Sequence, residues 1–261
     1  MARFALLLEY DGTPFVGWQR QGQGVSVQHV LETAAARLAS GAAVACTAAG
    51  RTDSGVHAQG QVAHLDLVAP ITQAALRDGL NFHMRPHPIA VVQASLVADD
   101  WHARFTAIGR GYRYRILNRR ARPALLRDQV WHVNRILDAA AMQDAAQALL
   151  GRHDFTSFRA TSCQAASPVR TLDRITVARD GDIIEIAVAA RSFLHHQVRN
   201  ITGTLKLVGD GKWPVSRVAE ALTARDRRAA GPTAPAAGLC LTKVQYPDNP
   251  FSEADEVKPT R

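Results

Sequence analysis

The chain has 261 residues, which is long enough for one large domain or two small ones. Hydrophobic residues make up 47% and charged residues 21%, so the chain is not intrinsically disordered, and no apolar run approaches the ~20 residues of a membrane-spanning helix. Thirty-one basic residues against 23 acidic ones give a net charge of +8, and only four of the basic residues are lysines, so the arginine excess favours a polyanionic partner.

The first half of the chain predicts six elements in the order strand, helix, strand, strand, helix, strand. Ser26 is a suitable N-cap for a helix, because apolar residues follow it at helical spacing from Val27 to Leu38. Apolar and polar residues alternate over 61–67, as they do in a half-buried strand. The remaining elements are strands at 3–9, 42–48 and 89–94 and a weaker helix at 72–80.

The second half predicts the same order with weaker signals. Alternating residues indicate a strand at 110–118, and Asp138 caps a helix that runs to Leu150, where Gly151 ends it. Asp180-Gly181 is a hairpin signal between the strands at 174–177 and 183–188. The other elements are a helix at 193–208 that Gly209 ends, a helix after Pro214, and a strand at 239–244.

This order predicts an α+β fold made of two tandem split βαβ (ferredoxin-like) units with mainly antiparallel sheets. We expect an N-terminal domain at 1–105, a C-terminal domain at 106–247 and a polar tail at 248–261. The two halves share no evident sequence identity, so the predicted repeat is one of topology alone.

The segment around Asp53 is the first candidate site. Gly50 and Gly55 flank it and permit positive φ or close backbone approach, so a tight loop can present the Asp53 carboxylate. The same residues would also suit a hairpin turn in which Asp53 only bonds its own backbone. Chemistry alone leaves both interpretations open.

The segment from Gly109 to Arg127 is a candidate RNA-binding surface. On a strand, Arg110, Tyr112 and Tyr114 share one face, while Arg113 and Arg115 share the other. Aromatic rings among arginines can stack on bases next to phosphate contacts. The alternative is a core face beside a solvated charged face, and we prefer that alternative for Tyr114.

The predicted helix at 193–208 carries Arg199 beside its apolar face. A half-buried arginine needs a carboxylate partner, for which Asp53, Glu9 and Asp154 are candidates. His195-His196 suggests a metal site, but adjacent residues of a helix diverge by ~100°, which argues against it. Three dispersed cysteines and the absence of phosphate-binding or dinucleotide glycine motifs lead us to expect no metal and no nucleotide cofactor, in a reducing, cytoplasmic setting.

The segment Gly50-Arg51-Thr52-Asp53-Ser54-Gly55-Val56-His57-Ala58 closely resembles the catalytic motif of TruA-type tRNA pseudouridine synthases. The resemblance continues in order along nearly the whole chain, up to about Tyr246, with modest departures at Ser54, Ala58 and the loop at 81–88. The segments that carry it are 9–12, 17–21, 26–28, 101–105, 110–114, 153–158, 195–201 and 237–239.

The resemblance implies an enzyme that isomerises uridine to pseudouridine at positions 38, 39 and 40 of the tRNA anticodon stem-loop. It also implies that no cofactor or metal is used, that a homodimer forms, and that no membrane is involved. It places the nucleophile at Asp53, a base-stacking side chain at Tyr112 and the aspartate's partner at Arg199. The expected substrate-binding residues are Tyr112, Arg51, Arg110, Arg113, Arg104 and Leu239.

Two other functions fit parts of the sequence. A tRNA-binding module without catalysis would keep the basic surface but would not need an aspartate–arginine pair. A nucleoside hydrolase or glycosidase also acts at C1′, but those enzymes use two carboxylates or a metal cluster, and here one isolated aspartate stands out. We expect Trp18, Phe155 and Phe158 to belong to the core.

Overall fold

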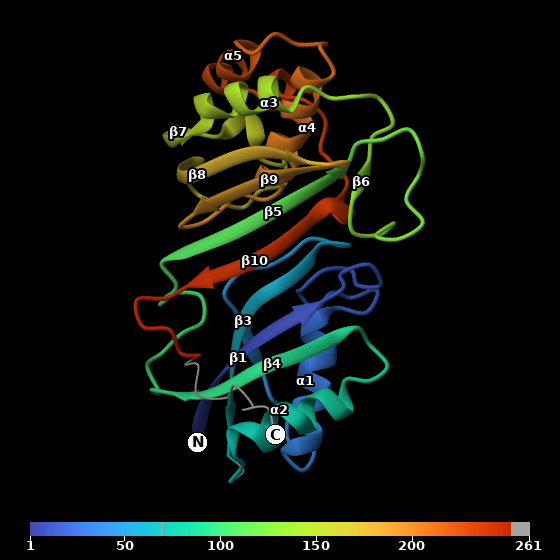
Figure 1. The fold of residues 1–261 in the computed structure, drawn as a ribbon. Helices are drawn as coiled ribbons and strands as arrows, with labels where there is room; N and C mark the ends of the chain where they lie inside the picture. Colours follow the sequence, from blue (N-terminus) through green and yellow to red (C-terminus); the bar gives the residue numbers. More distant parts are fainter. Residues whose placement is uncertain (69, 252–261) are drawn as a thin grey trace, which may run out of the picture.

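The computed structural model describes residues 1–68 and 70–251. A mainly antiparallel sheet of ten strands runs through the described part of the chain, with helices packed on each half (Figure 1). Its main path has the order β4-β1-β3-β10-β5-β9-β8-β7, while β2 pairs with β3 and β6 pairs with β5. No helix in the described ranges has the length and apolar character needed to cross a membrane.

The N-terminal half is a split βαβ unit. Its strands pair in the order β4-β1-β3-β2, so the first and third strands lie between the fourth and the second. Ser26 Oγ caps the first helix by accepting a hydrogen bond from His29 N, as predicted. The elements are β1 (Ala2–Tyr10), α1 (Val27–Leu38), β2 (Cys46–Ala48), β3 (His57–Leu67), α2 (Gln73–His83) and β4 (Ile89–Val97).

The C-terminal half repeats this arrangement with the order β10-β5-β9-β8. The Asp138 side chain caps its first helix through Ala141 N, again as predicted. The elements are β5 (Gly109–Leu117), β6 (Trp131–His132), α3 (Ala139–Ala146), β7 (Gly151–Asp154), β8 (Val169–Asp180), β9 (Ile183–Ala190), α4 (Gln197–Gly209), α5 (Arg217–Ala224) and β10 (Leu239–Gln245). The predicted α+β class of two tandem split βαβ units is confirmed.

Strand β10 joins the two halves. It pairs in parallel with β3 through Cys240 and Leu241, and in antiparallel with β5 from Leu239 to Gln245. Two hydrophobic cores lie on either side of this seam, one under α1 and α2 and the other under α3, α4 and α5. Tyr112 of β5 packs against both cores, which places its side chain where the two halves meet.

Several predicted boundaries were wrong. The helix predicted at 193–208 begins only at Gln197, because His196 has a left-handed φ of 61° that no continuous helix allows. The strand predicted at 42–48 begins at Cys46. Strands β6 and β7 were not predicted, since both are short and carry no alternating pattern. Of the tail predicted at 248–261, residues 252–261 lie outside the described residues.

Candidate active site

The loop between β2 and β3 presents Asp53, and its backbone is held from several sides. The Thr52 carbonyl accepts a hydrogen bond from Trp18 N at 3.0 Å. Buried Tyr10 places its hydroxyl 2.9 Å from Thr52 Oγ1, and Gln61 Nε2 donates to the Gly50 carbonyl at 2.8 Å. Burial raises the pKa of Tyr10 to about 12, so its hydroxyl remains protonated at neutral pH. These contacts fix the backbone on which Asp53 stands.

Two glycines allow this loop to pack closely against the loop that follows β1. Gly55 has a φ of +75°, and a turn closes in which Val56 N donates to the Asp53 carbonyl. Gly17 has a φ of +110°, and a Cβ on it would lie 2.6 Å from the Thr52 carbonyl oxygen. The backbone of Asp53 therefore forms the predicted turn, while its carboxylate is directed toward α4.

Arg199 on α4 is the partner of Asp53. Its Nη1 donates to Asp53 Oδ2 at 3.1 Å, and its Nε donates to the Ala234 carbonyl at 2.8 Å. The Arg199 and Asp53 side chains are 15% and 25% exposed, so the pair is half-buried and still open to solvent. Of the three candidate partners that the sequence left open, the structure brings Asp53 to Arg199.

A close approach behind α4 sets the position of Arg199. Gly203 lies in the middle of the helix, and a Cβ on it would lie 1.7 Å from the Pro232 carbonyl oxygen. The missing side chain lets the segment from Pro232 to Ala234 pass against the helix. This segment supplies the carbonyl that Arg199 Nε binds, while Ala234 N donates to the Arg199 carbonyl.

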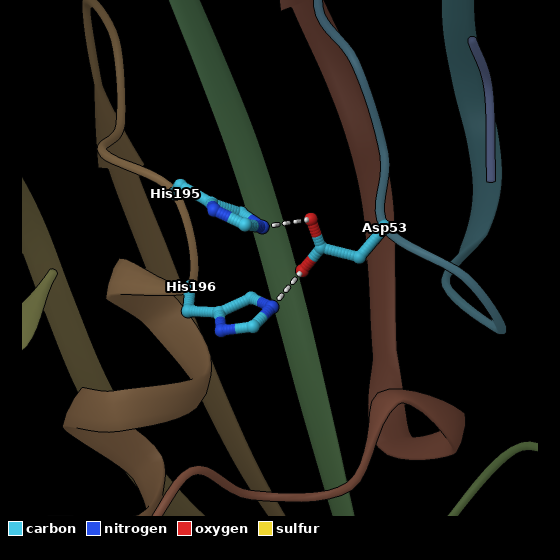
Figure 2. A group of neighbouring side chains, drawn as sticks. All are labelled: Asp53, His195 and His196. Atoms are coloured by element: carbon cyan, nitrogen blue, oxygen red, sulfur yellow. Dashed lines mark ion pairs between the residues drawn. The ribbon is translucent and has the colours of Figure 1, made fainter. Parts of the chain in front are cut away.

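His195 and His196 both face the Asp53 carboxylate (Figure 2). His195 Nε2 lies 3.3 Å from Oδ1 and His196 Nε2 lies 3.3 Å from Oδ2. The expectation that these two rings diverge was wrong, because both residues precede α4 and the left-handed φ of His196 turns the rings the same way. Burial lowers the pKa of His196, and His195, Arg199 and Arg227 act in the same direction against the opposing charge of Asp53.

These three side chains are the group in the described residues that could hold a metal ion. One ligand atom from each of Asp53, His195 and His196 lies within 4.8 Å of the others. Two imidazoles and one carboxylate are a donor set suited to zinc and related transition metals.

Tyr112 on β5 lies next to this group. Its ring meets the ring of Phe193 edge to face, with 5.1 Å between the ring centroids. Burial raises the pKa of the Tyr112 hydroxyl, and the nearby Tyr10 and the charge of Asp53 raise it further. Tyr114 is fully buried and donates to the Pro235 carbonyl at 2.8 Å, so it belongs to the core as expected.

Two further predicted substrate-binding residues lie at the edge of the site. Arg51 is exposed, and no hydrogen bond or ion pair of its side chain is found within the described residues. Arg104 is also exposed, with its guanidinium 5.7 Å from the centre of the Phe105 ring. Both side chains are free to meet a ligand from solvent.

Arg110 makes a different set of contacts. Its guanidinium donates to four backbone carbonyls, those of Ala49, Arg104, Ala107 and Arg191. Burial lowers the pKa of this guanidinium. Arg110 therefore ties the start of the Asp53 loop to the loop before β5 and to the segment after β9.

Arg113 and Leu239 lie away from the Asp53 group. Arg113 donates to Gln59 Oε1 at 3.1 Å and lies 3.6 Å from Glu185, on the face of β5 opposite to Tyr112. There it lines a cavity of about 430 Å³ together with Glu9, His57 and Cys240, among others. Leu239 is buried in the C-terminal core beside Tyr114.

Sequence reasoning missed the residues that support Asp53. Tyr10 and Gln61 hold its loop, and the two histidines contact its carboxylate. The segments of Tyr10 and of both histidines had been noted, but local spacing carries no information on contacts over more than 40 residues. Trp18, Phe155 and Phe158 are buried, as expected for core residues.

Comparison with known proteins identifies the family of the chain. Residues 7–106 and 145–247 match the family model of tRNA pseudouridine synthase. A tRNA pseudouridine synthase A of Acidiphilium cryptum is 64% identical over 252 residues, which cover 96% of this chain and 99% of that protein. Proteins of the same name from Paramagnetospirillum magneticum and Gluconobacter oxydans are 59% identical (94% of this chain, 96% of theirs) and 53% identical (97% and 92%). The chain therefore belongs to the tRNA pseudouridine synthase family, a family of isomerases.

Proposed function

We propose that this isomerase converts uridine to pseudouridine at positions 38, 39 and 40 of the tRNA anticodon stem-loop, with Asp53 as the nucleophile. One observation carries the proposal. The carboxylate of Asp53 stands on a rigid loop of the N-terminal half and pairs with Arg199 of the C-terminal half at 3.1 Å. A charged, fixed and partly solvent-accessible carboxylate is what an attack on the nucleotide requires.

The reaction moves the uracil ring without changing the composition of the nucleotide. The N1–C1′ bond breaks, the base turns, a C5–C1′ bond forms, and the proton on C5 is lost while N1 gains one. Asp53 assists the first step either by attacking C1′ or by removing a proton from C2′. In both routes Arg199 fixes the orientation of the carboxylate.

The detached uracil has to be held while it turns. Tyr112 can stack on it, since Phe193 fixes the Tyr112 ring at its edge and the charge of Asp53 lies nearby. Access to a stacked nucleotide requires that it flips out of the stem-loop. Arg51, which is exposed and lies two residues before Asp53, can fill or brace the gap that the nucleotide leaves.

The arginines supply the affinity for tRNA. Arg104 and the loop arginines after β5 can contact phosphates, although two of the loop arginines already pair with Asp182 and Asp128. Binding through them weakens as salt rises. Arg110 contributes by holding the loops that border the site, and Arg113 would reach RNA only from the opposite face of the sheet. The loop arginines are Arg119, Arg120, Arg122 and Arg127.

Two further features belong to the proposal. We place a domain boundary between residues 105 and 106, which the two separate hydrophobic cores support, although β10 contributes to both. We also propose a homodimer, on the family resemblance, and sedimentation of the purified protein tests it.

The reaction is tested by tritium release from tRNA labelled at uracil C5. Wild type should release tritium and Asp53→Asn should not, while the exposed Asp173→Asn provides a control with the same chemical change far from the site. Primer-extension mapping of pseudouridine then tests positions 38 to 40. Tritium release by Asp53→Asn would show that Asp53 is not the nucleophile. Pseudouridine found only elsewhere in the tRNA would refute modification at positions 38 to 40.

The two alternatives predict other products. A binding module would bind tRNA in a salt-dependent manner and release no tritium. A glycosidase would release free uracil, which chromatography separates from pseudouridine.

A further inference from the structure

We infer that Asp53, His195 and His196 form a binding site for a divalent transition-metal ion such as zinc, and that an ion bound there inhibits the enzyme. The inhibition rests on the proposed role of Asp53 as nucleophile, whereas the binding site stands on geometry alone. Both imidazole rings face the Asp53 carboxylate (Figure 2), and the side chains of His195, His196 and Asp53 are 40%, 28% and 25% exposed. The arrangement leaves a coordination position free for water or another ligand.

The separation of His195 Nε2 from Asp53 Oδ1 matches that of two ligand atoms in a tetrahedral metal site, and the third ligand atom lies within 4.8 Å. Zinc binds imidazole nitrogen and carboxylate oxygen at about 2.0–2.1 Å, so two tetrahedral ligand atoms lie about 3.3–3.4 Å apart. Each histidine Nε2 lies 3.3 Å from its nearest Asp53 oxygen. An ion at about 2.0–2.1 Å from both atoms would lie beside the line that joins them, so this separation need not change when the ion binds.

The backbone around the histidines is fixed without any ion. The His195 carbonyl accepts from Ala160 N at 2.9 Å, and the His196 carbonyl accepts from Asn200 N at 2.8 Å. His195 Nδ1 lies 3.5 Å from Ser162 Oγ. If Nδ1 donates to that hydroxyl, the lone pair remains on Nε2, which is the tautomer that a metal-binding histidine requires.

Arg199 lowers the affinity of the site for a metal ion but does not block the position of the ion. Its guanidinium donates to Oδ2 of Asp53, while Oδ1 faces His195, and among the described residues no hydrogen bond from Arg199 to Oδ1 is found. An ion can therefore use Oδ1 while Arg199 orients the carboxylate through Oδ2, as hydrogen-bonded carboxylates do in other metal sites. Because the arginine cancels the charge of Asp53, we expect weaker binding than at structural zinc sites.

The donor set also determines which ions bind. Imidazole ligands suit zinc, copper, nickel and cobalt, whereas magnesium prefers sites made only of oxygen. The magnesium that accompanies tRNA should leave the site unaffected. A bound transition metal would occupy the carboxylate lone pair that either proposed route requires, so zinc should inhibit by blocking Asp53.

Direct binding is the first test, on full-length protein without a histidine tag. Calorimetric titration of wild type with Zn²⁺ should show one site per chain. His195→Ala, His196→Ala and Asp53→Asn should each weaken binding at least tenfold. His83→Ala is the matched control, since His83 lies on α2, where its ring meets that of Phe82, and it should bind Zn²⁺ like wild type.

Two measurements on wild type remain decisive even if a variant fails to fold. X-ray absorption of the zinc-loaded protein should show two imidazole ligands and no sulfur. Tritium release should fall as Zn²⁺ is added at constant Mg²⁺ and return when a chelator removes the zinc.

Binding that is unchanged in all three variants, or a zinc ion ligated by sulfur, would overturn the site. Full activity with zinc bound would overturn the inhibition. If Asp53→Asn proves active, the proposed nucleophile fails, but the calorimetric result still decides the metal site.

Discussion

Replacing Gly203 by alanine tests whether a single close approach behind α4 controls the active site. The new Cβ would lie 1.7 Å from the Pro232 carbonyl oxygen, whereas a comfortable carbon–oxygen contact is about 3.3 Å. The backbone at Pro232 must therefore move by roughly 1.6 Å, and the Ala234 carbonyl that binds Arg199 Nε moves with it.

Two opposing effects set the change in stability. Alanine in place of glycine inside a helix stabilises by about 1 kcal/mol, while overpacking a filled site costs about 1–3 kcal/mol. Because the contact is with backbone that cannot rotate away, we expect a net loss of about 2 kcal/mol in the free energy of unfolding. In a protein of this size that lowers Tm by roughly 4–8 °C.

The substitution should reduce kcat strongly even at temperatures where the protein stays folded. A displacement of about 1 Å in a catalytic group can cost about 100-fold in rate, so kcat for tritium release should drop by that order at a temperature where the variant is folded. Gly79→Ala is the matched control, since Gly79 also lies inside a helix but its Cβ would meet only the movable end of Leu38. A Gly203→Ala protein with raised Tm and unchanged kcat would refute this reasoning.

Three further predictions use other contacts of the site and core. Arg199→Lys keeps the charge but replaces the two donor nitrogens that bind Ala234 O and Asp53 Oδ2 by a single one, so kcat should fall at least tenfold. A kcat equal to wild type would show that charge alone suffices. Tyr10→Phe removes the hydroxyl beside Thr52 Oγ1 and should cost about 1 kcal/mol, read as a Tm loss of roughly 2–4 °C, and an unchanged Tm would show that this contact does not hold the loop. Burial, helped by the charges of His102 and Arg3, lowers the pKa of His64 to about 4, so the unfolded chain binds the extra proton first as pH falls. The free energy of unfolding should therefore decline between pH 6.5 and pH 4 by up to about 3 kcal/mol. His64→Asn, whose amide oxygen can still accept a hydrogen bond from Ala103 N, should reduce this decline when unfolding is measured as a function of pH. An equal decline in the variant would assign the pH dependence to other groups.

The sequence predicted those features of the fold that depend on neighbours in the chain. Helix caps at Ser26 and Asp138 and the turn at Asp180-Gly181 are local signals, and all three lie where they were expected. Two repeats of the same element order were enough to predict the tandem split βαβ arrangement. The start of α4 was misplaced because the apolar spacing continues back to Phe193, while the backbone at His196 does not.

The site itself depended on contacts that local patterns do not encode. The sequence offered three carboxylates as partners for Arg199, and only the packing of α4 against the Asp53 loop selects one of them. Asp154, another candidate, instead accepts hydrogen bonds from Thr156 and lies 3.7 Å from Arg225. The histidine contacts could not be predicted either, because they depend on a single left-handed residue.

The position of β10 has a consequence for how the protein is made. This strand is synthesised long after β3 and β5, yet it lies between them. At ribosomal rates of ~5–20 residues per second, the roughly 170 residues between β3 and β10 take about 9–35 s to synthesise, and the roughly 120 residues between β5 and β10 take about 6–24 s. An open edge readily pairs with strands of other chains. The nascent protein therefore passes through an aggregation-prone interval, and the Ala234 carbonyl that Arg199 binds reaches the active site only at the end of it.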